Sequence, residues 1–286
     1  MSHIVAFEAL DQTLKDSRRN SHVMGGATVL MAGDFRQTLL VITRGTRADE
    51  KLNLTTNMRV HGDADSVVFS KLLPEVGNGA THGIDKEHIR LSFGIFVSSV
   101  FPDLELQERS ILAPHNATVN AVNQHLLDQV AGDEVSFNQL PPGFPPHDLR
   151  LKIGVPVMLL RNVEPPELYN DTRLIIKTTG IRILTTTFLN GPSAGVTVIN
   201  PLMSLSPSAV PFEFTRRHFP VKVCFVISIN KAQGQSLQVV GLDLAQQVFT
   251  HGQLYVGCSH IGSPHNLFIC GNPGNTRNVV YKEALQ

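Results

Sequence analysis

The chain has 286 residues, and its 24 lysines and arginines balance its 24 aspartates and glutamates, so the formal net charge is zero. This balance gives no sign of the basic surface with which a free-standing nucleic-acid-binding protein neutralises phosphates. The apolar content of 42% is ample for one large domain or for two to three small ones.

Cysteine usage and apolar runs bear on the cellular compartment. Cys224, Cys258 and Cys270 have no C-x-x-C spacing and are odd in number, which predicts free thiols in a reducing compartment. No apolar run reaches the length of a membrane span, and the first residues lack the basic-then-apolar layout of a signal peptide. We therefore expect an intracellular protein that no membrane holds.

The first part of the chain combines a helix pattern with a strand pattern. Apolar residues three and four positions apart predict an amphipathic helix over residues 4–16. Residues 28–32 form a continuous apolar run, typical of a buried parallel strand, and the polar string GDFRQ follows at residues 33–37. Because ligands bind beyond the carboxyl ends of strands in an open α/β sheet, this string is a site candidate on geometry alone.

The middle of the chain changes character at a proline-rich stretch, residues 141–146. Before this stretch, helices are predicted over residues 67–76 and 116–129, and a strand at 110–114 forms a β-then-α unit with the second helix. After it, short β-type runs separated by turns favour a small barrel or sandwich. These predicted strands cover residues 149–153, 156–160, 172–177, 181–188 and 195–199.

The last part of the chain returns to the pattern of a parallel sheet. Strands are predicted at residues 221–225, 239–244 and 267–270, and the apolar pattern alone would extend the first of them to residue 229. Thr250 is in position to cap a helix that runs to about residue 259.

Two polar strings near the C-terminus would be costly in a core unless their polar groups had a role. They are INKAQGQSL at residues 229–237 and HGQLYVGCSHI at residues 251–261. Together with GDFRQ and with LNLTTNMRV at residues 52–60, they closely resemble signature motifs of the Pif-like, superfamily-one DNA helicases, especially the branch carried by Helitron transposons. The resemblance runs over nearly the whole chain and keeps the family's order of motifs.

This resemblance implies an α/β fold. The second motor domain of the family is a RecA-like parallel sheet with helices on both faces, into which a small SH3-like β-barrel is inserted. The family also has a short helix at residues 226–233, ended by Gly234, where the apolar pattern alone would continue a strand. The implied domains are a remnant of the first RecA-like domain (1–50), the second motor domain in two parts (51–140 and 219–286), and the SH3-like insertion (147–218).

The resemblance also implies a function and a set of site residues. The family binds ATP and Mg²⁺ and moves 5′ to 3′ along single-stranded DNA, in DNA repair, recombination and telomere maintenance, which implies a nuclear location. Gln37 matches a glutamine that senses the terminal phosphate, Arg59 matches an arginine that contacts it, and His260 stands at the position of a second arginine. The other matched positions are Gly33, Asp34, Gly234 and Gln235 for the nucleotide, and Asn230, Lys231, Gln233 and His251 for DNA.

The chain departs from the family pattern at three places, and the first two of these departures weaken the expected activity. No G-x-x-x-x-G-K-[ST] loop occurs in the chain, and the family's acidic pair would precede Met1, so most of the first motor domain is expected to be absent. His260 cannot offer the bidentate fork of an arginine, whose loss typically costs about 10³ to 10⁵ in rate. Asp171 stands where the family usually has glycine, a minor change because aspartate tolerates turn conformations.

We therefore expect a truncated, transposon-derived helicase that does not hydrolyse ATP by itself, unless an upstream coding segment supplies the missing parts. The alternative is a non-enzymatic module that binds single-stranded DNA or a protein partner with the second motor domain. The sequence does not indicate an oligomeric state.

Other polar and aromatic groups favour structural explanations. His61, Asp63 and Asp65 alternate like metal ligands but lie in a polar stretch that contains glycine, so no protein metal site is expected there. Phe219 and its neighbouring aromatic residues could stack on bases, although core packing is the commoner role of such residues.

Overall fold

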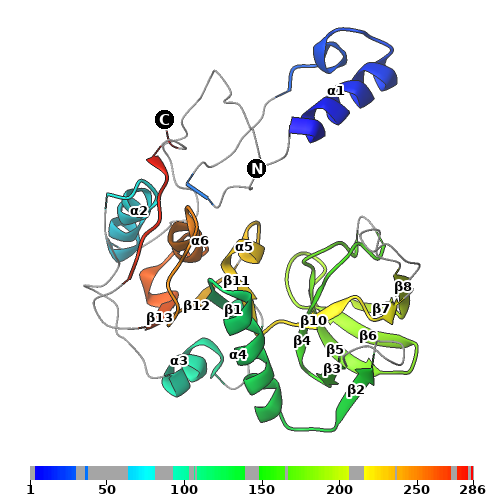
Figure 1. Cartoon of the computed structure of the whole chain (residues 1–286), viewed down its shortest axis with the longest axis vertical. Helices are drawn as coiled ribbons and strands as arrows, with labels where there is room; N and C mark the ends of the chain where they lie inside the picture. The colour runs from blue at the N-terminus through cyan, green and yellow to red at the C-terminus, as the bar shows by residue number, and fades with distance from the viewer. Residues whose placement is uncertain are drawn as a thin grey trace.

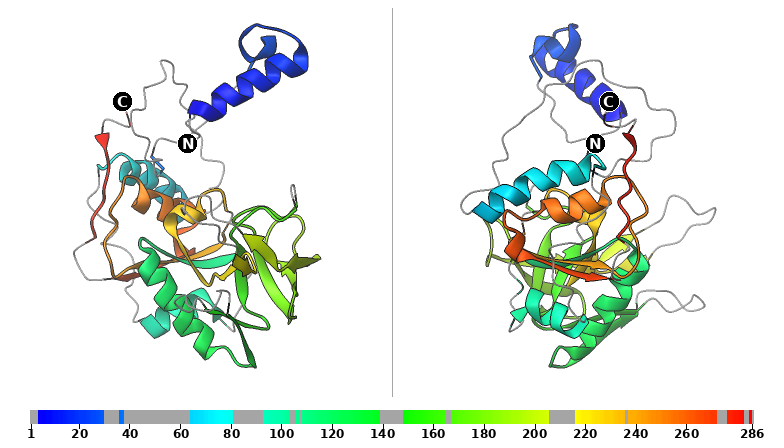
Figure 2. Two further views of the ribbon diagram at one scale, coloured as in Figure 1. Left: turned by 45° about the vertical axis from the view of Figure 1, so that its right-hand side comes forward. Right: turned by 90° about the vertical axis from the view of Figure 1, so that its left-hand side faces the viewer.

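The computed structural model describes residues 4–29, 36–37, 64–80, 93–102, 106, 108–138, 148–164, 167–205, 216–235, 237–271, 276–282 and 285. The strand predicted at residues 28–32 and the motif at residues 52–60 lie largely or wholly outside these residues. The helix predicted at residues 4–16 is confirmed as α1 (Ile4–Arg18), which packs against the short 3₁₀ helix η1 (Val23–Gly26) and projects away from the sheets (Figures 1 and 2).

A four-stranded parallel sheet forms the centre of the molecule. Its strand order is β11 (Val226–Ser228), β1 (Arg109–Ala113), β12 (Val239–Leu244) and β13 (Leu267–Gly271). In the register, Ile111 of β1 pairs with Val226 on one side and with Gly241 on the other. Strand β12 is buried along its whole length, as expected of a parallel strand that is covered on both faces.

Helices cover both faces of this sheet (Figure 1). One face carries α3 (Phe93–Val100) and α4 (Asn116–Gln129), and the other carries α2 (Ala64–Gly77), α5 (Ile229–Ala232) and α6 (Gln253–Ser259). Successive residues of β1 alternate between the two cores: Ile111 packs in the cluster that contains Phe96, and Leu112 in the cluster that contains Leu254. The arrangement is a three-layer α/β/α fold, which confirms the expected parallel sheet with helices.

An antiparallel, β-rich part is inserted between α4 and β11. Its main sheet has the order β10–β4–β5–β6–β7, and two-stranded ribbons β2–β3 and β8–β9 accompany it. The strand predicted at residues 221–225 was wrongly assigned to the parallel sheet, because residues 221–223 pair antiparallel with β4 in this sheet. Its core includes the fully buried Leu159, Leu174 and Leu184, and Phe219 packs there edge-on to Phe137. The strands are β2 (Glu134–Asn138), β3 (Asp148–Lys152), β4 (Pro156–Leu159), β5 (Arg173–Thr179), β6 (Ile183–Phe188), β7 (Thr197–Pro201), β8 (Met203–Leu205), β9 (Arg216–His218) and β10 (Val221–Val223).

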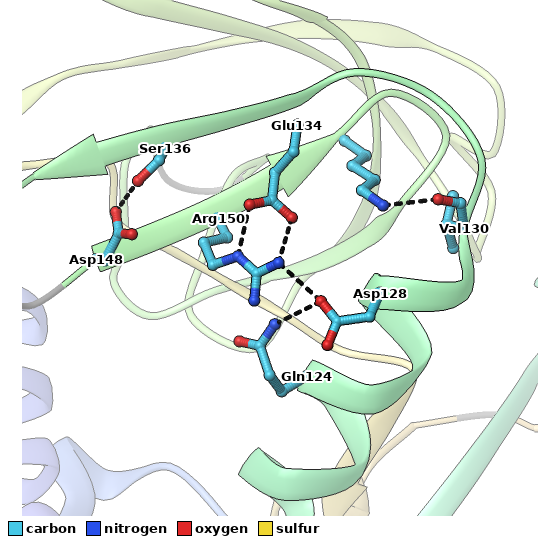
Figure 3. Close-up of polar contacts among 8 residues, drawn as sticks. Gln124, Asp128, Val130, Glu134, Ser136, Asp148 and Arg150 are labelled. Carbon is cyan, nitrogen blue, oxygen red and sulfur yellow. Dashed lines mark hydrogen bonds and ion pairs between the residues drawn. The ribbon is translucent and has the colours of Figure 1, made fainter.

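A cluster of charged side chains joins the β2–β3 ribbon to the end of α4 (Figure 3). The Arg150 guanidinium donates to both Glu134 oxygens, at 2.6 and 2.5 Å, and to Asp128 Oδ1 at 2.7 Å. These bonds hold the pKa values of both carboxyl groups below their usual range. Lys152 Nζ adds a bond to the Val130 carbonyl at 2.7 Å, so two basic side chains of β3 attach the ribbon to this helix end.

The predicted helix at residues 226–233 is wrong for its first half. Val226 and Ile227 belong to β11 and pair with Ile111 and Leu112, and only Ile229–Ala232 is helical. As a strand, residues 226–228 form backbone hydrogen bonds with the edge of β1. If these residues were helical instead, the backbone groups at that edge of β1 would lose these partners. Gly234 does follow the helix with φ +81°, the left-handed conformation expected of it.

The predicted capping role of Thr250 is also wrong. Helix α6 begins after Gly252, whose φ is +72°, and no side-chain hydrogen bond caps it at that residue. The Thr250 backbone N–H instead donates to the Gln253 side chain.

The described part of the chain includes no helix that is both long and apolar enough to cross a membrane. The same residues include no group of three His, Cys, Asp or Glu side chains that could hold a metal ion. All three cysteines are free, and burial raises the pKa of the Cys258 thiol to about 12, so this thiol stays protonated and inert. The domain boundaries given above remain predictions.

Candidate functional site

The two C-terminal motifs meet at the carboxyl edge of the parallel sheet. Helix α5 follows β11 directly, and α6 follows the loop after β12, so both start from the same edge and pack against each other (Figure 1). His260, at the end of α6, places its ring Nδ1 3.3 Å from the Gln235 carbonyl oxygen. The structure thus brings together His260 and Gln235, two positions predicted from different motifs.

A second link between the motifs runs through Gln253, which is 1% exposed. Its Oε1 accepts the backbone N–H groups of Phe249 and Thr250, at 3.0 and 3.3 Å, and its Nε2 donates to Asn230 Oδ1 at 3.4 Å. Gln253 therefore organises the start of α6 and orients Asn230 on α5. No role was predicted for Gln253 from the sequence. Its position on the same helix face as Gly257 and His260 could have indicated one.

Lys231 lies at the surface of α5 and contacts the β-rich part. Its Nζ lies 3.0 Å from Asp171 Oδ1 and 3.2 Å from Oδ2, and its side chain is 48% exposed. Gln235 Nε2 adds hydrogen bonds to the Lys231 and Asp171 carbonyl oxygens, at 3.3 and 3.5 Å. The turn that contains Asp171 is therefore part of the site, which the sequence did not indicate.

Gln235 carries a further group of interest. Its Oε1 is buried and has no hydrogen-bond donor among the described residues. A buried oxygen in this state costs about 1–3 kcal/mol, which a ligand donor could recover. Gln233 and the exposed Gly234 complete the loop after α5.

His251 is fully buried beneath the C-terminal segment. Its Nδ1 accepts the Tyr281 backbone N–H at 2.8 Å, and its ring stacks on that of Tyr281 at 5.5 Å. The neighbouring Gly252 N–H donates to the Val279 carbonyl at 3.1 Å. His251 therefore faces protein on the sides that these contacts define, and its predicted DNA contact stays a prediction.

Gln37 reaches the same edge from the N-terminal part of the chain. A Cβ at Gly252 would lie 2.1 Å from the Arg36 carbonyl oxygen and 2.8 Å from the Gln37 carbonyl carbon, so the two backbones touch. Arg36 Nε also donates to Asn78 Oδ1 at 2.9 Å. Gln37 thus lies beside the loop that leads to α6, whereas Gly33, Asp34 and Arg59 lie outside the described residues.

A cavity of about 880 Å³ lies elsewhere, between the β-rich part and the amino ends of β1 and β12. Its walls include Arg109, Lys177, Phe188 and Val239. No predicted site residue is among the described residues that line it, so the motifs and this cavity are separate features.

Comparison with known proteins finds similar helicases over most of this chain. The family model described as PIF1-like helicase matches residues 1–87, and the model described as DNA helicase Pif1, 2B domain, matches residues 138–178. The ATP-dependent DNA helicase PIF1 of Danio rerio is 26% identical in an alignment 290 residues long, gaps included. The alignment covers 91% of this chain and 43% of that protein. The ATP-dependent DNA helicase Pif1 of Bdellovibrio bacteriovorus is 25% identical, and the match covers 96% of this chain and 63% of that protein.

Solved structures show the same fold. The crystal structure of the Pif1 helicase from Candida albicans matches with a TM-score of 0.69 at 20% identity, over 98% of this chain and 72% of that one. The Bacteroides Pif1 helicase in complex with ADP-AlF3 and single-stranded DNA matches with a TM-score of 0.65 at 19% identity, over 96% and 69%. The chain spans about half of the length of the curated relatives it matches.

Proposed function

We propose that this chain, which is related to the Pif1-like DNA helicases by sequence and by fold, supplies the second motor domain of an ATP-dependent 5′-to-3′ DNA helicase. One observation carries the proposal: the two C-terminal motifs converge on one edge of the parallel sheet, through His260 and Gln235 at 3.3 Å and through Gln253 and Asn230 at 3.4 Å. In this proposal the parallel sheet is RecA-like, the β-rich part is the SH3-like insertion, and the segment before residue 51 is the end of a first RecA-like domain.

The proposed nucleotide side of the site contains Gln37, Gly234, Gln235 and His260, with Gly33, Asp34 and Arg59 completing it. The orphan Gln235 oxygen supports a ligand contact there, because a donor on the ligand would satisfy it. The ligands of this site would be the ATP phosphates and the Mg²⁺ ion that accompanies them. Since His260 stands where the family pattern has an arginine, we expect weaker stabilisation of the terminal phosphate.

The proposed DNA side contains Asn230, Lys231, Gln233 and His251. Lys231 supports it best, because its half-exposed side chain carries an ammonium group on the helix that follows β11. An ammonium group at this position neutralises one phosphate of a single strand. By the same resemblance we propose a Helitron-type origin, a nuclear location, and roles in DNA repair, recombination and telomere maintenance.

The test is DNA-stimulated ATP hydrolysis by residues 1–286, measured beside the His260→Arg variant. We expect neither protein to exceed background, because no phosphate-binding loop lies within these residues. Hydrolysis by the unmodified chain would overturn that expectation. If neither form hydrolyses ATP, a longer chain with an in-frame Gly-Lys-Thr loop upstream is the enzyme to assay.

A second candidate is a non-enzymatic module that binds single-stranded DNA. The exposed Lys231 side chain favours it, since its ammonium group can bind a DNA phosphate whether or not a nucleotide is bound elsewhere in the site. Fluorescence anisotropy with a labelled oligonucleotide at several salt concentrations tests it. Loss of salt-dependent binding in Lys231→Ala would support a DNA site at α5, and unchanged binding would contradict one.

A further inference from the structure

We propose that Asp171 controls how tightly, and with what salt dependence, Lys231 binds a nucleic-acid phosphate. The Asp171 carboxylate competes with the phosphate because it already forms an ion pair with the Lys231 ammonium group. The inference rests on the proposed DNA role of Lys231. It deepens that role by naming a residue of the β-rich part that controls the site. The observation behind it is the nearly symmetric contact of Lys231 Nζ with the two Asp171 oxygens, at 3.0 and 3.2 Å.

The turn that carries Asp171 is held in place by its own backbone. The Asp171 N–H donates to the Leu159 carbonyl at 2.9 Å, the Thr172 N–H to the Tyr169 carbonyl at 3.2 Å, and the Asn170 N–H to the Asn162 side chain at 2.8 Å. The carboxylate therefore reaches Lys231 from a turn whose backbone is held by hydrogen bonds.

The backbone at Asp171 shows that this side chain is not what the turn requires. Its φ is +69°, in the left-handed region where glycine is free of strain and where aspartate or asparagine is tolerated. Glycine would make the same turn at a lower conformational cost. What the aspartate adds is the carboxylate, which contacts Lys231 and accepts a hydrogen bond from the adjacent Asn170 amide.

The ion pair is accessible and weak enough for a phosphate to displace it. The Lys231 and Asp171 side chains are 48% and 31% exposed. Pairs at such exposure contribute little to stability, whereas phosphate and carboxylate oxygens are equivalent acceptors for an ammonium group. Displacement takes a new lysine rotamer and removes the ammonium group from Asp171 Oδ1, a buried atom, while α5 and the turn stay joined through Gln235 Nε2, which donates to the Lys231 and Asp171 carbonyl oxygens.

The experiment measures the affinity of a labelled single-stranded oligonucleotide by fluorescence anisotropy between about 50 and 200 mM salt, the range over which phosphate contacts are lost. The central variant is Asp171→Asn, which keeps the shape of the side chain and tolerates positive φ. We expect roughly twofold to fivefold tighter binding at the lowest salt, because an exposed competing charge is removed. We also expect log Kobs against log salt to steepen by roughly 0.7, the value of one additional phosphate contact to a single strand.

Two controls separate this effect from net charge. Asp133→Asn removes the same charge from an exposed loop after α4, and screening should leave the affinity nearly unchanged. In the double variant Asp171→Asn with Lys231→Ala, the gain should vanish, because the cation that the aspartate controls is gone.

The outcomes distinguish the inference from the proposed function. If Lys231→Ala weakens binding and Asp171→Asn binds no tighter than Asp133→Asn, the DNA site stands and the role of Asp171 is wrong. If neither Lys231→Ala nor Asp171→Asn alters binding, the DNA role of α5 and the inference both fall.

Discussion

At the residue scale, the site depends on buried amides more than on charges. Gln253 is buried, and its side chain satisfies two backbone N–H groups and the Asn230 side chain. Because removal leaves the Phe249 and Thr250 N–H groups without this acceptor, Gln253→Ala should lower the free energy of unfolding by about 1–3 kcal/mol, as measured by urea denaturation. The matched control is Gln129→Ala on the exposed face of α4, which should change it by no more than about 0.5 kcal/mol. Equal effects of the two changes would contradict the role given to Gln253.

A second prediction at this scale concerns the contact between Gly252 and the segment at residues 36–37. Gly252→Ala combines a φ of +72° with a Cβ placed 2.1 Å from the Arg36 carbonyl oxygen, so backbone must move. Gly154→Ala is the control, since its φ is +84° and its Cβ would meet no atom within 4 Å. The control should cost about 1–2 kcal/mol from the left-handed conformation alone, and Gly252→Ala should cost more. Thermal and urea unfolding give both values, and a smaller loss for Gly252→Ala would refute the described contact.

At the element scale, the charged cluster around Arg150 predicts a pH dependence. Arg150 lowers the pKa values of Glu134 and Asp128 from their ordinary 4.5 and 3.8. A carboxyl group with a lowered folded-state pKa stabilises the fold above its unfolded pKa, and this stability is lost as the pH falls through the folded value. The urea midpoint of the wild type should therefore fall more steeply below about pH 4.5 than that of Arg150→Met.

The control for this prediction is Arg182→Met, which changes an exposed arginine before β6. It should follow the wild-type pH profile. If Arg150→Met also kept that profile, the cluster would not anchor the ribbon to α4 in solution.

Most elements followed from local patterns, and the exceptions have a physical reason. Helix α4 and strands β1, β4 and β12 were predicted from apolar periodicity because each buries its own apolar residues. Strand β11 was assigned to a helix because the family resemblance was preferred there to the apolar pattern, which alone continued a strand to residue 229; the pairing of β11 with β1 agrees with the apolar pattern. The strands β2, β8 and β9 were not predicted either. Strands β8 and β9 have three residues each, too few for an alternating pattern to show.

The same distinction applies to the site. The motif strings predicted which residues belong together, and His260 and Gln235 do meet. The contacts of Lys231 with Asp171 and of His251 with Tyr281 could not be predicted, because they join residues from separate elements through tertiary packing. These contacts decide which side chains of the motifs stay accessible.

At the scale of the whole molecule, the parallel sheet and the β-rich part are joined at several points. Arg173 of β5 donates to the Arg109 carbonyl at 2.9 Å, and the Glu108 N–H donates to Asn190 Oδ1 at 3.2 Å. Val223 packs against the cores of both parts. We therefore expect the two parts to unfold together.

Leu184→Ala tests this expectation from within the β-rich core. The change should cost about 2–5 kcal/mol, because Leu184 is fully buried. Hydrogen exchange should then quicken in β1 as well as in β5. Ile181→Ala is the control, since this side chain is exposed and should leave exchange unchanged. Faster exchange confined to β5 would show that the two parts unfold independently.

The placement of the β-rich part within the chain also has a consequence for the order of folding. Ser110 and Phe225, which meet where β1 and β11 pair, are 115 positions apart in the chain. Closing so long a loop directly is entropically unfavourable, and each halving of its length recovers about 0.6 kcal/mol. The pairing of β10 with β4 brings residues 221–223 beside residues 157–159 and so shortens the loop before the central sheet forms. The hairpins between residues 148 and 223 should therefore assemble first, and the edge where the motifs meet should be among the last parts of the molecule to form.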